Sequence, residues 1–118
     1  HAPNVGLRKE AAAAWGRSAA QDLLGRAPIP EAVGCADDVS ALGAIDVLRK
    51  AGLQIPKDVA ITGFDNTPFA ELLTPTLTAV DQPTHQIAQE AVRLIEEALD
   101  HPPTSTALAP HLILRHPA

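Results

Sequence analysis

The chain has 118 residues, which is enough for one ordinary domain or for part of a larger one. Its nine Lys and Arg residues are scattered and outnumbered by fourteen Asp and Glu residues, a net charge of −5, which argues against a surface that tracks nucleic-acid phosphates. Because the chain contains neither an apolar run of membrane-spanning length nor a recognisable signal peptide, we expect a cytoplasmic protein with no membrane partner.

The first half of the chain is predicted to contain a helix, a strand and a second helix. Residues 9–24 favour a helix because four consecutive alanines are strong helix formers and Gly25 is well placed to end it. An apolar strand is predicted over residues 32–36, in which the single Cys35 is expected to be a small buried hydrophobic side chain. A second helix is predicted over residues 38–51, whose acidic first turn and basic last turn complement the helix dipole.

The second half is predicted to contain two strands, a long helix and a final strand. Residues 59–64 and 77–80 favour strands, and the strand–helix–strand order implies parallel pairing through a right-handed crossover. Residues 83–100 favour a helix with one buried apolar stripe, and residues 108–115 favour a last strand after the loop over residues 101–106. The apolar stripe of the helix over residues 83–100 comprises Ile87, Ala91, Leu94, Ile95 and Ala98. The predicted fold class is α/β, with a parallel sheet flanked by helices.

Polar side chains follow three of the predicted strands at the point where each strand ends. Asp37 and Asp38 follow the first strand, Asp65 follows the second, and Gln82 comes just after the third. In an open α/β sheet, ligands bind in the crevice beyond the carboxyl ends of the strands. The sequence therefore predicts a pocket for a polar small molecule at this edge.

Five blocks of sequence occur in a specific order and spacing. They are CADDVSALGA at 35–44, GLQIPKDVAITGFDN at 52–66, LTP at 73–75, LTAVDQP at 77–83 and LILR at 112–115. Together they resemble the closing portion of the effector-binding region of LacI/GalR-type bacterial transcriptional repressors. The resemblance spans less than half of that region and includes neither the family's helix-turn-helix nor its hinge.

The resemblance implies an incomplete fold of the periplasmic-binding-protein-like type I class. Residues 1–83 and 108–118 would form most of the C-terminal lobe, and residues 84–107 would be a helix and loop contributed to the N-terminal lobe. The implied function is that of an effector-sensing fragment of a repressor, which binds a small polar ligand such as a sugar or a related metabolite. The implied partners are that ligand, a second copy in a homodimer, and operator DNA through a helix-turn-helix absent from this chain.

The resemblance also assigns Asp65, Asp37 and Gln82 to the ligand site. An ionised carboxylate at position 65 can accept two hydroxyl donors at once, although an Asp-Asn pair also suits a turn. Asp37 stands where the family commonly has Asn, which favours an effector with more donors or with positive charge, but an N-cap role is equally open. Gln82 would border the cleft between the lobes, and its alternative is an ordinary surface glutamine.

Two further assignments concern an aromatic side chain and a subunit interface. Trp15 could stack on a sugar ring, although packing in the core is the more common role of a lone Trp on a helix. The dimer interface would be formed by residues of the second helix and of the segment after position 68, although a core loop explains the latter about as well. The interface residues are Leu42, Ile45, Arg49, Phe69, Leu72 and Leu73.

Catalysis is the disfavoured interpretation. The Asp cluster with His85 nearby could bind a divalent cation, but no Cys/His metal spacing, nucleophile elbow or Gly-rich phosphate loop is present. A receiver-like signalling domain would need a Lys after a late strand, and neither Lys50 nor Lys57 follows a strand end. We therefore predict no catalytic residue, no metal and no cofactor. A periplasmic sugar-binding receptor of a transporter stays open as an alternative with the same fold.

Overall fold

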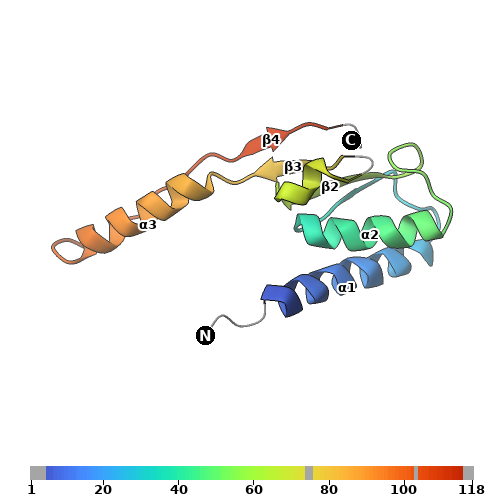
Figure 1. Cartoon of the computed structure of the whole chain (residues 1–118), viewed down its shortest axis with the longest axis horizontal. Coiled ribbons are helices and arrows are strands. Elements are labelled where there is room, and N and C mark those ends of the chain that lie inside the picture. The colour runs from blue at the N-terminus through green and yellow to red at the C-terminus, as the bar shows by residue number, and fades with distance from the viewer. Residues whose placement is uncertain (1–4, 74–75, 103, 116–118) are drawn as a thin grey trace.

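The computed structural model describes residues 5–73, 76–102 and 104–115 of the chain. Every predicted helix and strand is present, and a short 3-10 helix, η1, is an addition that the sequence did not predict (Figure 1). The element order is α1 (Val5–Leu24), β1 (Ala32–Gly34), α2 (Asp38–Lys50), β2 (Ala60–Asp65), η1 (Pro68–Glu71), β3 (Thr78–Asp81), α3 (Thr84–Ala98) and β4 (His111–Ile113).

The four strands form one mixed sheet in the order β1-β2-β3-β4. β1 pairs in parallel with β2, and β2 pairs in parallel with β3, as the strand–helix–strand order predicted. The parallel sheet needs one correction, because β4 pairs antiparallel with β3. The chain leaves β3 through α3 and returns along its path, so its last strand meets β3 in the opposite direction (Figure 1).

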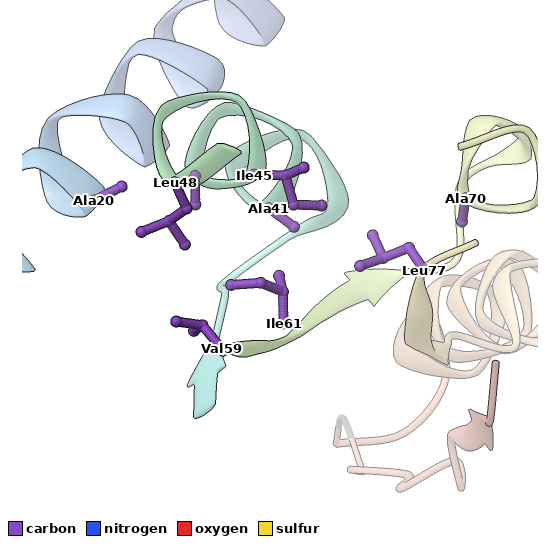
Figure 2. Packing of buried hydrophobic residues seen from close by; sticks show 9 residues of the cluster. Ala20, Ala41, Ile45, Leu48, Val59, Ile61, Ala70 and Leu77 are labelled. Carbon is purple, nitrogen blue, oxygen red and sulfur yellow. The ribbon is translucent and has the colours of Figure 1, made fainter. Parts of the chain in front are cut away.

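The core lies between the two N-terminal helices and the sheet, and it is entirely aliphatic. Side chains of α2 point toward β2 and the residue before it, and Ala20 of α1 packs from the other side (Figure 2). The buried cluster comprises Ala20, Ala41, Ala44, Ile45, Leu48, Val59, Ile61, Ala70 and Leu77. α2 is therefore sandwiched between α1 and the sheet, which fixes the position of its N-terminus relative to β2.

Two glycines allow α1 and α2 to cross with their backbones in contact. A Cβ atom added at Gly16 would lie 2.0 Å from the carbonyl oxygen of Ser40, and one added at Gly43 would lie 2.1 Å from that of Ala13. Real Cβ atoms do not approach so closely. Neither glycine can carry a side chain unless the helices separate.

The apolar stripe predicted to be buried on α3 is not buried in the described part of the chain. α3 projects away from the sheet (Figure 1), and none of its residues is buried. Ile87 is 42% exposed and Ile95 is 67% exposed. The periodicity identified an apolar face correctly, but among the described residues only the returning segment near Thr106 and Leu108 lies against this helix. None of the described helices is long and apolar enough to cross a membrane.

Candidate functional site

The carboxyl ends of β2 and β3 bring Asp65 and Gln82 together. Asp65 and Asp81 are register partners at the ends of these strands, so the residue after Asp81 lies beside Asp65. The side-chain amide of Gln82 donates a hydrogen bond from Nε2 to Oδ1 of Asp65. The other oxygen of Asp65, Oδ2, accepts no side-chain hydrogen bond within the described residues. The two side chains are half-buried, so the pair can offer a carboxylate oxygen to a ligand.

The backbone at this point is held in an uncommon conformation. Asp65 has φ of 101° and Asn66 has φ of 55°, and both are non-glycine residues in the left-handed region. Such residues cost on the order of 1–3 kcal/mol each and persist only where the surroundings hold them. Asn66 is tied to β3, since its Nδ2 donates to Oδ1 of Asp81 over 3.1 Å. Its Oδ1 is buried and accepts no hydrogen bond from the described residues.

Asp37 acts as the N-cap of α2. Its backbone is extended, and its Oδ1 accepts a 2.6 Å hydrogen bond from the Ser40 amide. This is one of the two roles that the sequence left open for Asp37. Asp37 also affects the neighbouring thiol: burial, and to a lesser extent the Asp37 carboxylate, raise the pKa of Cys35 to about 11. Cys35 is therefore an uncharged thiol at neutral pH.

Asp38 is the residue of this region whose importance sequence reasoning missed. It is fully buried at the start of α2, and its Oδ2 accepts hydrogen bonds from the Thr67 amide (2.6 Å) and the Thr67 hydroxyl (2.8 Å). Its Oδ1 is buried without a hydrogen-bond partner among the described residues. A Cβ atom at Gly63 would lie 2.2 Å from that oxygen. The acidic pair after β1 was the available signal, but it does not tell a capping Asp from a buried one.

The structure places Trp15 apart from this group. Its side chain is 80% exposed on α1, so the alternative that it packs in the core is excluded. It lines a cavity of about 190 Å³ together with Leu23 and residues 33–36, whereas Asp65 and Gln82 do not line it. Its proposed stacking on a sugar is untested. His85 is exposed on α3, and no cluster of three metal-binding side chains occurs among the described residues.

The residues assigned to a dimer interface differ in their exposure. Leu42 and Arg49 are exposed on α2, and Leu72, which follows η1, is 80% exposed. Phe69 and Leu73 are half-buried. Ile45 is buried in the core of this chain and offers little surface to a partner. A concavity of about 320 Å³ lies along α2 between Leu42 and Lys50.

The chain matches the family model described as a periplasmic binding protein-like domain over residues 1–116. It is 38% identical over 103 residues to the HTH-type transcriptional regulator CelR of Thermobifida fusca, covering 85% of this chain and 30% of the relative. It is 41% identical over 80 residues to the HTH-type transcriptional repressor CytR of Escherichia coli, covering 68% of this chain and 24% of the relative. The chain therefore spans less than a third of the length of these curated relatives.

Solved structures give the same picture. The transcriptional regulator CelR–cellobiose complex is similar with a TM-score of 0.82 and 37% identity, covering 87% of this chain and 32% of that chain. A LacI family transcriptional regulator from Lactobacillus casei with bound sucrose has a TM-score of 0.72 and 32% identity, covering 87% and 39% of the two chains. These relatives are transcriptional regulators rather than enzymes.

Proposed function

We propose that this chain, which belongs to the periplasmic-binding-protein-like family, contacts a small polar effector through Asp65, Gln82 and Asp37. It corresponds to the C-terminal part of the effector-binding domain of LacI-type regulators. The observation that carries this proposal is the Asp65–Gln82 pair, which joins the ends of two parallel strands at the edge where α/β sheets bind ligands.

The chemistry of these side chains favours an effector rich in hydrogen-bond donors. Asp65 uses one oxygen for Gln82, which leaves Oδ2 for a hydroxyl or ammonium group. Asp37 uses Oδ1 to cap α2, and its second oxygen is the one available to a ligand. A sugar or a related metabolite fits this set of acceptors, and related regulators have been solved with cellobiose, sucrose and glucose.

The projecting α3 supports a two-lobed arrangement. We assign residues 84–107 to the N-terminal lobe, and residues 1–83 and 108–118 to the C-terminal lobe. The exposed apolar side chains of α3, which include Val92 (56% exposed) and Leu99 (81% exposed), would pack against the rest of the N-terminal lobe. An effector held between the lobes would favour one of their relative arrangements through differential contacts.

A change in the arrangement of the lobes would affect DNA binding through parts of the protein other than this chain. In a homodimer that associates partly through Leu42 and Leu72, a change in lobe arrangement would alter the spacing of two helix-turn-helix heads on the operator. The curated relatives support this role, because they are named as HTH-type regulators. They favour a transcriptional regulator over the receptor of a sugar transporter.

The test is a calorimetric titration of the whole protein with cellobiose, sucrose and glucose. Asp65→Ala is expected to weaken binding of the sugar that binds best by about tenfold or more, because a hydrogen bond to a charged group is worth roughly 1.5–3 kcal/mol. Asp22→Ala removes an exposed carboxylate from α1 and serves as the matched control. An unchanged titration curve for Asp65→Ala, with folding intact, would refute the assignment of the site.

A further inference from the structure

The buried carboxylate of Asp38, on α2, binds the loop of residues 65–67 at the end of β2. Asp38 belongs to the first turn of α2, yet both hydrogen bonds that it accepts are donated by Thr67, 29 positions later in the chain. Thr67 directly follows the left-handed pair Asp65 and Asn66. A single side chain therefore ties the start of α2 to the end of this loop.

The loop is held at three successive residues by three different partners. Asp65 is held by Gln82, Asn66 by Asp81, and Thr67 by Asp38. The first two partners follow or end β3, and both are half-buried. Asp38 is the fully buried one, and it makes two bonds at 2.6 Å and 2.8 Å. All three ties end on a carboxylate oxygen, so the tie to Asp38 is distinguished by its complete burial and by its two hydrogen bonds where the others have one.

Burying the carboxylate of Asp38 has an unfavourable free-energy cost, because one of its oxygens has no hydrogen-bond partner among the described residues. Its Oδ1 is buried without a partner among the described residues, and it occupies space that any side chain at position 63 would fill. A buried acceptor without a partner is unfavourable. An apolar side chain at position 38 would avoid this cost but would leave the amide and hydroxyl of Thr67 without their acceptor.

We propose that Asp38 is a positioning residue for the effector site: through Thr67 it holds Asp65 and Asn66 in their left-handed conformation, and so aims the Asp65 carboxylate at the ligand without touching the ligand itself. This rests on the proposed function insofar as Asp65 binds the effector. The part that concerns the loop is independent of any ligand.

Hydrogen–deuterium exchange of the ligand-free whole protein tests the loop directly. In peptides that span residues 64–69, Asp38→Ala is expected to speed exchange about tenfold or more, because the Thr67 amide loses a charged acceptor. Thr67→Val removes the hydroxyl donor and should speed exchange less, whereas Thr67→Ser keeps both donors and should match the wild type. Unchanged exchange in Asp38→Ala would overturn the proposal. Should that variant fail to fold, unchanged exchange in Thr67→Val would do so.

Titration with cellobiose, or with sucrose or glucose if one of these binds more tightly, tests the consequence for binding. Asp38→Ala should weaken binding about tenfold or more, and Thr67→Ser should stay within threefold of the wild type. The matched control is Thr78→Val, which removes a buried hydroxyl bonded to the backbone of Arg115 at the opposite end of β3. It should lower the melting temperature but keep the affinity.

The two measurements separate the possible failures. Faster exchange with unchanged sugar affinity in Asp38→Ala would overturn the positioning role and leave the proposed function intact. Equal losses of affinity in Asp38→Ala and Thr78→Val would also overturn it, since general destabilisation would then explain both. If the wild type bound none of the three sugars, the sugar-sensing proposal would fail, and the exchange of residues 64–69 would still decide whether Asp38 holds the loop.

Discussion

Gly63→Ala is expected to be one of the most destabilising small substitutions in this chain. The added Cβ would lie 2.2 Å from Oδ1 of Asp38 and 2.9 Å from a methyl group of Leu77, whereas ordinary contacts begin at 3.4 Å. Asp38 is fully buried, so its carboxylate cannot swing into solvent. Either β2 shifts, or Asp38 moves and loses its two hydrogen bonds to Thr67.

Both outcomes carry a large free-energy cost. Overpacking a core costs typically 1–3 kcal/mol, and each lost hydrogen bond to a charged group costs roughly 1.5–3 kcal/mol. We therefore expect Gly63→Ala to lower the free energy of unfolding by about 1–3 kcal/mol if β2 shifts, or by about 3–6 kcal/mol if Asp38 loses both hydrogen bonds, against the roughly 5–15 kcal/mol of an ordinary domain. Urea denaturation of the whole protein, followed by circular dichroism, measures this loss.

The neighbouring strand supplies a matched control. Gly34 lies in β1 opposite Thr62, and a Cβ at that position would make an ordinary 3.7 Å contact with the Thr62 hydroxyl. Gly34→Ala should therefore change stability by less than about 1 kcal/mol. The double variant Gly63→Ala with Asp38→Ala should cost less than the sum of the two single changes, because removing the carboxylate makes room for the new methyl group. A loss for Gly63→Ala no larger than that for Gly34→Ala would refute this reasoning.

Three further predictions concern individual side chains. Asp37→Ala should destabilise the protein by about 1 kcal/mol through loss of the α2 N-cap, whereas Asp37→Asn keeps an acceptor for the Ser40 amide and should be nearly neutral in thermal unfolding. Cys35 should react with a disulfide reagent about a hundredfold more slowly at pH 8 than a thiol of pKa 9, because burial raises the pKa of Cys35 to about 11 and reduces its thiolate fraction; equal rates would contradict this. If the protein forms the proposed homodimer, Leu72→Asp in the whole protein should shift it toward monomer in sedimentation velocity without loss of folding, since this side chain is 80% exposed in one chain; an unchanged mass would exclude Leu72 from the interface.

Local signals in the sequence predicted the helices and strands well. Gly25, the acidic pair after β1 and the turn residues between strands mark boundaries that depend on neighbours in the chain, so α2 and β3 were located to within one or two residues. The proximity of Asp65 and Gln82 followed from parallel strands ending at one edge. Their roles as ligand contacts are still predictions.

The features that sequence reasoning missed depend on packing between distant segments. Asp37 and Asp38 look alike in the sequence, but only the position of α2 over β2 decides which carboxylate faces solvent and which faces Gly63. The direction of β4 depends on the path of α3. The burial of Ile95 depends on what packs against α3, which periodicity does not reveal.

The backbone contact between α1 and α2 limits how the protein can move. With Gly16 against the carbonyl of Ser40 and Gly43 against that of Ala13, neither helix can slide or roll against the other without steric collision. The two helices should therefore move together as a rigid body. Ser40 lies in the first turn of α2, which also contains Asp38. A displacement of α1 is therefore expected to displace the first turn of α2 as well, where Asp37 caps the helix and Asp38 holds Thr67.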